Sequence, residues 1–413
     1  MSFAASYASA PAGVTVDLAL SGGPQNTTSA GIDTLISFEN LSGSAHGDIL
    51  AGDFLNNDID GGDGNDVLFG REGDDNLNGG TGDDAISGGP GDDIMSGHTG
   101  TDLVSYLFST AGVTVTLATT DPQDTGGAGT DRLYFFENLD GSLFNDTLSG
   151  NHGANVMQGG DGDDFVDGAA GNDSLSGGNG GDTLIGRGGN DTLDGGANPE
   201  GGGGQGDILL GGEGNDTYLV DSGLDLVDED FIFPGFGNGG VDTIISTADF
   251  YWDTQSVGEV LRISEDVVDA GGDGVTAVGG VFNNTIEGHS GTDVLFGRGG
   301  SDTYRGGDGV DFISLSTLGL TDANSYVGVN GVNTVIVEER TTGAFSYDIV
   351  FEFESGKDKF DVSDYGFASQ AAAFATGVNA GAGSSYFILG DGLDYLWVAG
   401  RTLAQLSPDD FVV

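Results

Sequence analysis

The chain has 413 residues, of which 10 are Lys or Arg and 66 are Asp or Glu, so its formal net charge is −56. Such a charge excludes nucleic acid as a natural partner, because nucleic-acid-binding surfaces need clustered basic side chains, and it opposes binding to an anionic membrane. Cys is absent, which excludes disulfides and zinc–thiolate sites, and no run of about 18 apolar residues predicts a transmembrane helix. The 80 Gly residues are far above the usual share, and the hydrophobic share of 37% is enough for a core.

The N-terminal segment predicts short strands. VTVDL at 14–18 alternates apolar and polar residues, as a half-buried strand does. The starting sequence MSFAASYASAPAG lacks the basic region and the long apolar region of a standard export signal, so no such signal is predicted.

A period of nine residues governs three long stretches of the chain. From residue 61 the units GGDGNDVLF, GREGDDNLN, GGTGDDAIS, GGPGDDIMS and GHTGTDLVS continue without a slip to residue 105, and two looser units precede them from residue 43. A second array starts at 141 and resumes after a glycine-rich insertion around 198–204, and a third covers 279–314. The shared pattern is GGxGxDxUx, in which U is a large apolar residue.

Each position of this pattern has a predicted role. Positions seven to nine form a short strand whose middle side chain points inward, and the glycines let positions one to six reverse the chain. This places a stacked core at Leu68, Leu77, Ile86, Met95, Val104, Val166, Leu175, Leu184, Leu193, Leu295 and Ile313.

The Asp at position six is the candidate ligand. Stacked turns lie one strand spacing apart, roughly 4.8 Å, so columns of these carboxylates would repel one another unless cations lay between them. Carboxylate and carbonyl oxygens suit Ca²⁺ better than Zn²⁺ or Cu²⁺. Arg71, Arg187 and Arg298 stand at position two of their turns, where we expect them to relieve the carboxylate repulsion locally.

About eighteen units in three arrays resemble the haemolysin-type calcium-binding nonapeptide repeat, the RTX family. The resemblance implies an all-β fold of Ca²⁺-loaded parallel β-rolls, in which two nonapeptides make one coil of a right-handed β-helix and each ion bridges successive turns. Asn57, Asn155 and Asn284 replace the Asp near the start of each array, where we expect weak binding or none. The residues that match the family's metal-binding position are Asp66, Asp75, Asp84, Asp93, Asp102, Asp164, Asp173, Asp182, Asp191, Asp216, Asp293, Asp302 and Asp311.

A longer duplication overlies the nonapeptides, because residues 6–44 recur at 105–142 at offsets of 99 and then 98 residues. The C-terminal region also resembles the uncleaved signals of type I secretion, and the chain ends in an acidic residue followed by apolar ones, Asp410-Phe411-Val412-Val413. The predicted organisation is an N-terminal β spacer or cap at 1–42, β-rolls at 43–105, 141–219 and 279–314, β spacers at 106–140 and 220–278, and a C-terminal β-rich cap with the secretion region at 315–413.

The sequence predicts a secreted, non-catalytic calcium-binding protein, because none of the catalytic motifs HExxH, GxSxG or a P-loop is present. Its expected role is extracellular assembly or adhesion, as part of a surface layer, matrix or filament. Its expected partners are Ca²⁺, the type I secretion machinery, and a further copy of itself or a cell-surface polysaccharide. The alternative is that it is the RTX portion, or a relative, of a secreted polysaccharide-modifying enzyme.

Deletion of residues 346–413 is expected to abolish export. Cells that carry a type I exporter should then retain the truncated chain, because the segment that resembles the secretion signal is gone. Immunoblots of medium and cell fractions measure this, and secretion of the truncated chain at the full-length level would contradict the prediction.

Overall fold

The computed structural model describes the first half of the chain almost continuously and the second half mainly at its strands. The described residues are 3–197, 206–222, 224–227, 242–246, 250–251, 260–263, 276–279, 284–288, 293–297, 302–305, 312–314, 325–327, 334–336, 346–351, 359–361, 369–370, 373, 376–381, 384–389, 394–398 and 402–412. The chain divides into two compact units, Met1–Gly211 and Gly212–Val413, and each is considered by itself.

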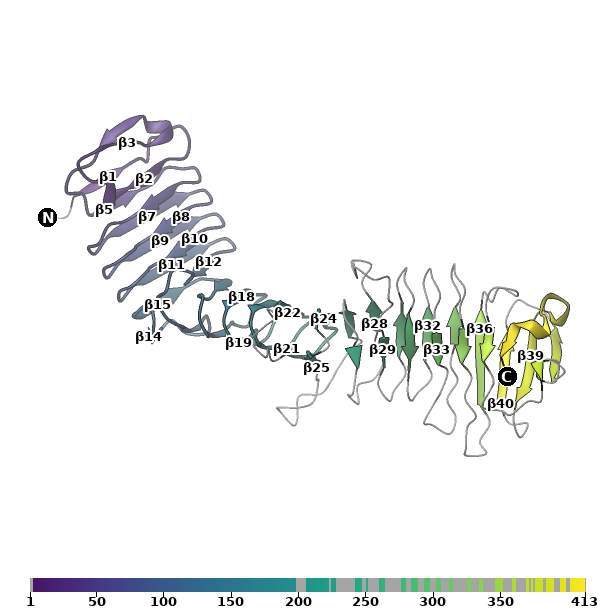
Figure 1. The fold of residues 1–413 in the computed structure, drawn as a ribbon. Helices are drawn as coiled ribbons and strands as arrows, with labels where there is room; N and C mark the ends of the chain where they lie inside the picture. The colour runs from purple at the N-terminus through teal and green to yellow at the C-terminus, as the bar shows by residue number, and fades with distance from the viewer. Residues whose placement is uncertain are drawn as a thin grey trace. The chain divides into compact units, whose positions relative to one another are not determined.

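Unit 1 is built from ladders of short parallel strands, drawn as successive rungs in Figure 1. One ladder runs through the whole unit as β2 (Thr15–Asp17), β6 (Ile49–Ala51), β8 (Val67–Phe69), β10 (Ala85–Ser87), β12 (Leu103–Ser105), β16 (Asn138–Asp140), β18 (Val156–Asp161), β20 (Ser174–Asn179) and β22 (Thr192–Ala197). Within the arrays, paired residues are 18 apart in sequence, as in Val67 with Ala85. Two nonapeptides therefore make one coil, and the predicted all-β roll is confirmed.

The other side of unit 1 changes ladders at the spacer. A first ladder comprises β1 (Ala4–Ser6), β5 (Asn40–Ser42), β7 (Asp58–Asp63), β9 (Asn76–Thr81), β11 (Ile94–Thr99) and β15 (Thr130–Tyr134). A second comprises β13 (Thr114–Thr116), β17 (Thr147–Ser149), β19 (Phe165–Asp167) and β21 (Thr183–Gly188), and β23 (Ile208–Glu213) follows. The N-terminal spacer adds the antiparallel pair β3 (Pro24–Asn26) and β4 (Ile32–Thr34) with the 3₁₀ turns η1 (Leu18–Leu20) and η2 (Thr28–Ala30), and β14 (Gln123–Asp124) pairs likewise with β15.

Many strands are longer than the three predicted residues, as in β7, β9 and β11 of one ladder and β18, β20 and β22 of the other. Strands such as β8 cover positions seven to nine as expected, but β7, β9 and β11 have six residues and continue to position three of the following repeat. In this extension Gly62 pairs with Gly80 across successive coils. A Cβ atom on Gly80 would overlap the carbonyl oxygen of Gly62, so glycine is what permits the longer pairing.

The core is formed by the position-eight side chains of both ladders. Every residue predicted for the stack is buried, with Leu68, Val104 and Leu184 at 0% exposure. Successive position-eight side chains belong to alternate ladders, as Leu68 in β8 and Leu77 in β9 do, so the two sheets together enclose the apolar core.

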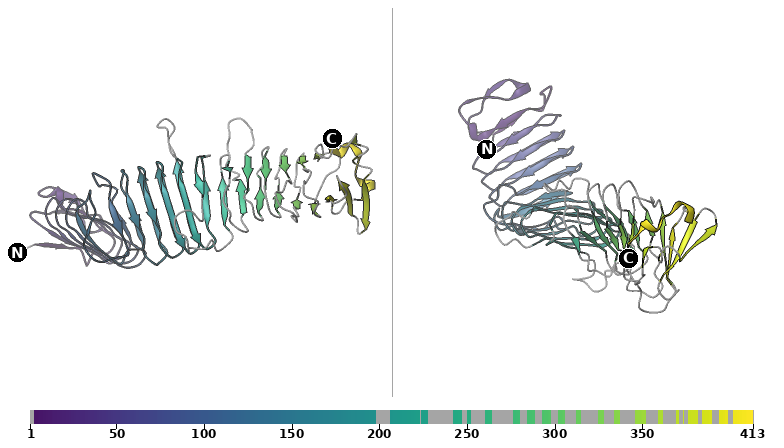
Figure 2. Two further views of the ribbon diagram at one scale, coloured as in Figure 1. Left: turned by 90° about the horizontal axis from the view of Figure 1, so that it is seen from below. Right: turned by 45° about the vertical axis from the view of Figure 1, so that its right-hand side comes forward.

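Unit 2 repeats the parallel arrangement (Figure 2). One ladder holds β24 (Thr217–Val220), β26 (Thr243–Ser246), β28 (Val260–Ile263), β30 (Thr285–Glu287), β32 (Thr303–Arg305), β34 (Ser325–Val327) and β36 (Ser346–Phe351). The other holds β27 (Phe250–Tyr251), β29 (Thr276–Val278), β31 (Val294–Phe296), β33 (Phe312–Ser314), β35 (Thr334–Ile336), β37 (Lys359–Asp361) and β41 (Phe411–Val412), and β25 (Leu226–Val227) lies near the start of the unit.

An antiparallel hairpin ends the stack of unit 2. β38 (Gly377–Gly381), β39 (Ser384–Leu389) and β40 (Asp394–Val398) pair in series, and β40 joins the ladder through β36. The ring of Phe411 lies 5.5 Å from Phe360 and 4.8 Å from Phe387, centroid to centroid, and all three are fully buried. The short 3₁₀ turns η4 (Leu403–Gln405) and η5 (Pro408–Asp410) lead into β41. The seven segment boundaries drawn from the sequence stay predictions.

The glycine at position one has a packing role that the pattern alone does not reveal. A Cβ atom on Gly79 would overlap the side chain of Asp84, five residues further on, and the same holds for Gly61 against Asp66. Position one is thus kept free of a side chain so that the carboxylate of position six can lie against the backbone.

Gly79→Ala is therefore expected to destabilise the Ca²⁺-loaded protein by about 1–3 kcal/mol, the usual cost of overpacking. Gly188→Ala is the matched control, since a Cβ atom there meets nothing within 4 Å. Urea unfolding at saturating Ca²⁺ compares the two variants, and equal free energies of unfolding would contradict the packing argument.

Candidate metal centre

The position-six side chains lie inside the turns, although they are the most polar residues of the repeat. Asp66, Asp84 and Asp102 have exposed fractions of 1%, 2% and 0%. The strand that comes next starts at position seven in each repeat, so the backbone enters the ladder directly after the carboxylate. The site residues found buried are Asp66, Asp75, Asp84, Asp93, Asp102, Asp164, Asp173, Asp182, Asp191, Asp216, Asp293 and Asp302, and Asp311 lies outside the described residues.

In the columns of position-six residues, one carboxylate oxygen bonds to the preceding coil. The backbone N–H of Asp66 donates to Oδ1 of Asp84 at 2.8 Å, and the N–H of Asp84 donates to Oδ1 of Asp102 at 2.9 Å. In the second array Asp164 donates in the same way to Asp182 at 2.8 Å. These bonds join residues 18 apart, so the position-six residues form columns that run along the roll on either side.

The second carboxylate oxygen is the functional feature of the turn. Oδ2 is buried and has no hydrogen-bond partner among the described residues, in a setting where buried polar atoms are normally paired. An unpaired buried carboxylate oxygen is costly, and a cation is the partner that would remove the cost. The residues that share this feature are Asp66, Asp75, Asp84, Asp93, Asp102, Asp164, Asp173 and Asp182.

Burial changes the protonation of these carboxyl groups. It raises the pKa of Asp66 to about 7 and the pKa of Asp93 to about 8, with the neighbouring carboxylates as a smaller cause. The pKa of Asp84 is likewise raised by burial, to about 6. The backbone N–H bond to Oδ1 acts in the opposite direction but is the weaker effect. Removal from water, more than the repulsion expected from the sequence, is therefore what disfavours the charged form without an ion.

The donor set suits a hard cation that takes backbone ligands. Within the described residues, no three His, Asp or Glu side chains come together in a way that could hold a metal ion, so the ligands of an ion in these turns would have to include backbone carbonyl oxygens. The carbonyl oxygen of Gly79 and Oδ2 of Asp66 both lie beside Gly61, which brings a carboxylate and a carbonyl of the next coil together. Such all-oxygen sets fit Ca²⁺, and a bound ion would be the positively charged partner that Oδ2 does not have among the described protein groups.

Further residues of the columns were not among the predicted ligands. Asp131 and Glu137, in the spacer, accept the N–H groups of Asp93 and Asp102 at 3.0 and 2.9 Å. Their offsets of 38 and 35 residues break the 18-residue period, so the repeat gave no signal for them. Asp48, Asp146 and Asp207 stand at position six of looser repeat units, so the nine-residue period could have identified them. Asp242 accepts the N–H of Asp216 at 2.7 Å but lies in a spacer, outside the repeats.

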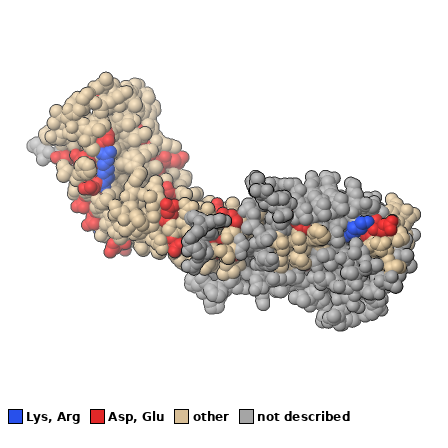
Figure 3. All heavy atoms as spheres, in the orientation of Figure 1, with Lys and Arg blue, Asp and Glu red and all other residues tan. Residues whose placement is uncertain are grey.

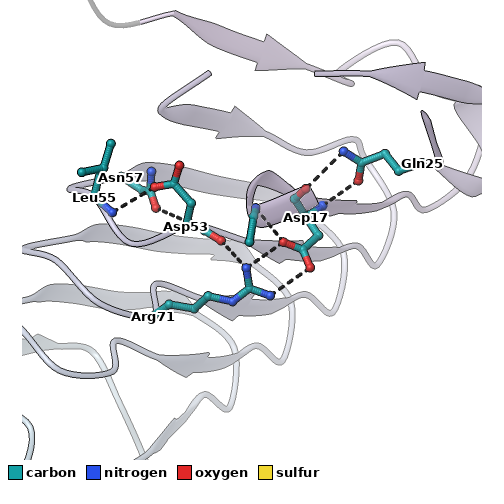
Figure 4. Close-up of polar contacts among 8 residues, drawn as sticks. Asp17, Gln25, Asp53, Leu55, Asn57 and Arg71 are labelled. Atoms are coloured by element: carbon teal, nitrogen blue, oxygen red, sulfur yellow. Dashed lines mark hydrogen bonds and ion pairs between the residues drawn. The ribbon is translucent and has the colours of Figure 1, made fainter. Parts of the chain in front are cut away.

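Two position-two arginines make specific ion pairs, of which Figure 4 shows that of Arg71. Arg71 binds both carboxylate oxygens of Asp17 at 2.7 and 2.9 Å and the carbonyl oxygen of Gly52 at 2.7 Å. Arg187 binds both oxygens of Asp167 at 2.6 Å. Arg71 thus ties the roll to the N-terminal spacer across 54 residues, a more directed role than the general relief of repulsion expected from the sequence. Arg298 lies outside the described residues.

Figure 3 shows acidic side chains spread over the visible face of the described residues, with basic side chains in few places. No helix in the described part of the chain is long and apolar enough to cross a membrane.

Comparison with known families gives one finding. The family model described as the RTX calcium-binding nonapeptide repeat (4 copies) matches residues 42–77, 69–104, 140–175, 167–198, 202–227 and 278–313. These ranges contain all the buried position-six residues of the three predicted arrays. A comparison with curated proteins found no match.

Without Ca²⁺ the fold is expected to become less stable as the pH rises from about 5 to about 8. Because the folded-state pKa values of Asp66, Asp75 and Asp164 are raised to about 7, the folded chain binds more protons than the unfolded chain above about pH 4. The free energy of unfolding then falls with rising pH.

Circular dichroism of metal-free protein at the two pH values measures this loss, and saturating Ca²⁺ should remove it. Addition of Ca²⁺ at about pH 6 should also release protons, since the ion and the protons compete for the same oxygens. A metal-free fold that gains stability with rising pH would show that the buried carboxylates are already ionised.

Proposed function

Because the chain is an RTX calcium-binding repeat protein, we propose that it works outside the cell as a structural component, in Ca²⁺-dependent assembly or adhesion. The observation that carries the proposal is the succession of buried Oδ2 atoms without a hydrogen-bond partner, from Asp66 to Asp102 and again from Asp164 to Asp182. These same carboxylates bond one coil to the next through Oδ1. Each site filled at about 1,000 times its dissociation constant would add about 4 kcal/mol to the folded state.

The proposal places the folded protein where Ca²⁺ is abundant. Extracellular Ca²⁺ modules typically bind at about 10⁻⁴–10⁻³ M, and a chain that needs many ions to fold stays unfolded at lower concentrations. Export of an unfolded chain through a type I system would fit this requirement. Folding would then follow export.

Ionisable side chains other than the position-six carboxylates support a non-catalytic role. Arg71 and Arg187 are engaged with Asp17 and Asp167, and the ring of His98 packs against Phe135 with 6.2 Å between centroids. These groups are used for packing and for ion pairs. A polysaccharide-modifying activity stays the alternative.

Exposed apolar side chains near the start of unit 1 support assembly. Ile32 and Ile36 are 75% and 65% exposed, and Phe54 and Leu55 in the turn at 52–57 are 65% and 60% exposed. An unpaired edge of β4 also supports assembly. Among the described residues β4 pairs with β3 alone. Its counterpart in the duplicated spacer, β15, pairs with β14 on one side and with β11 on the other. An open edge strand can pair with another chain.

Raising Ca²⁺ to about 1 mM should produce larger species by light scattering, and a chelator should reverse the effect. The double variant Asp84→Ala with Asp173→Ala should weaken it, because each array loses a buried carboxylate. Asp83→Ala with Asp163→Ala is the matched control, since these side chains lie outside the buried columns and carry the same charge.

A strictly monomeric protein at this Ca²⁺ concentration would contradict the assembly role. Measurable turnover of a charged polysaccharide would favour the enzyme alternative. An equal loss of scattering in both double variants would show that net charge, and not the buried site, controls association.

A further inference from the structure

The turns of unit 1 fall into two kinds, which differ in the backbone at position two. In most turns this residue has a positive φ, as at Gly62 (108°), Arg71 (83°) and His98 (79°). In the first two turns of each of the two arrays in unit 1, the position-two residue does not have a positive φ. We call these four turns, 43–48, 52–57, 141–146 and 150–155, the leading turns.

In a leading turn the N–H of position two bonds to the side chain of position six. Ser44 N–H donates to Oδ2 of Asp48 at 2.6 Å, and Asp53 N–H donates to Oδ1 of Asn57 at 2.7 Å, as Figure 4 shows for the second case. The second array repeats both bonds, from Ser142 to Asp146 at 2.5 Å and from Asn151 to Asn155 at 2.8 Å.

The other side-chain oxygen of the leading aspartates is also fully used. Oδ1 of Asp48 accepts the N–H of Val14 at 2.6 Å and the hydroxyl of Ser44 at 3.0 Å. In the second array, Oδ1 of Asp146 accepts the N–H of Val113 at 2.7 Å and the hydroxyl of Ser142 at 2.8 Å. Protein donors therefore surround both oxygens of a carboxylate that elsewhere in the column has one oxygen open.

The leading asparagines fit their places as amides. Nδ2 of Asn57 donates to the carbonyl oxygen of Glu39 at 2.8 Å, and Nδ2 of Asn155 donates to the carbonyl oxygen of Glu137 at 2.6 Å. A carboxylate there would face a carbonyl oxygen without a proton between them. Asn is thus suited to a turn that is closed by protein groups.

We propose that the four leading turns hold no Ca²⁺ and that protein N–H and O–H groups take the place of the ion there. The N–H and the hydroxyl of Ser44 donate to the carboxylate of Asp48. They occupy the position beside this carboxylate that a cation would otherwise take, and so exclude the cation. The ion sites begin one coil later, at Asp66 and Asp75 in the first array and at Asp164 and Asp173 in the second.

The far end of the first array is closed by the same means. Oδ2 of Asp131 accepts the buried hydroxyl of Tyr106 at 3.1 Å and the hydroxyl of Thr125 at 3.3 Å, while its Oδ1 accepts the N–H of Asp93. The spacer thus ends a column of open carboxylates with one that is fully bonded. Each leading coil gives the Ca²⁺-loaded coils a template whose own bonds need no metal.

Counting bound ions in paired variants tests the proposal. Asp48→Asn and Asp146→Asn are expected to leave the number of Ca²⁺ per chain unchanged in equilibrium dialysis of the full-length protein. Asp66→Asn and Asp164→Asn, one coil further on, are expected to lower it by one each. Loss of an ion in Asp48→Asn or Asp146→Asn in a chain that keeps its β circular dichroism would overturn the proposal.

A measurement on the unaltered protein covers the case in which a variant fails to fold. Crystals soaked in a lanthanide salt should show anomalous density beside Asp66, Asp75, Asp164 and Asp173, and none beside Asp48 or Asp146. Density beside either leading aspartate would overturn the proposal whatever the variants do.

Discussion

The architecture of unit 1 depends on one hydrogen bond, in which the backbone N–H of a position-six residue donates to the Oδ1 of its counterpart 18 residues later. The bond draws a carboxylate into the turn, where burial raises its pKa and leaves Oδ2 exposed to neither water nor a donor. The need for glycine at position one, the preference for an all-oxygen cation site and the dependence on pH all result from this placement. The bond joins the same successive coils that the backbone ladders pair, as in β8 with β10.

A column of such bonds has to begin and end somewhere, and its ends show how the chain manages without an ion. Asp48 and Asp146 are bonded by Ser at position two and by a spacer N–H, and Asp131 is bonded by Tyr106 and Thr125. The duplicated spacer thus supplies the donors on both sides of the first array. The sequence Phe-Glu-Asn-Leu occurs in both copies of the spacer, at 38–41 and 136–139, and takes part through the carbonyl oxygens of Glu39 and Glu137.

Much of this could be predicted from the nine-residue period. It located the buried stack from Leu68 to Leu193 and the columns of position-six residues from Asp66 to Asp191, because both recur at fixed positions of the repeat, but it did not predict that these carboxylates are buried. The sequence could not show that Ser44 and Gly62, at the same repeat position, differ in φ. Nor could it pair Arg71 with Asp17, or place Asp131 and Glu137 in the columns, since these contacts join the repeats to segments with another period.

The continuous ladder through β16 has a consequence for how such proteins change in length. Strand β16 pairs with β12 of the first array and with β18 of the second, so one side of the roll passes the spacer without interruption. The rest of the spacer is accommodated on the other side, where β13 and β17 take over from β11 and β15. A tandem duplication of the unit of about 98 residues, made of spacer and array, can therefore lengthen the roll directly. The first strand of the new copy can pair with the last strand of the copy before it.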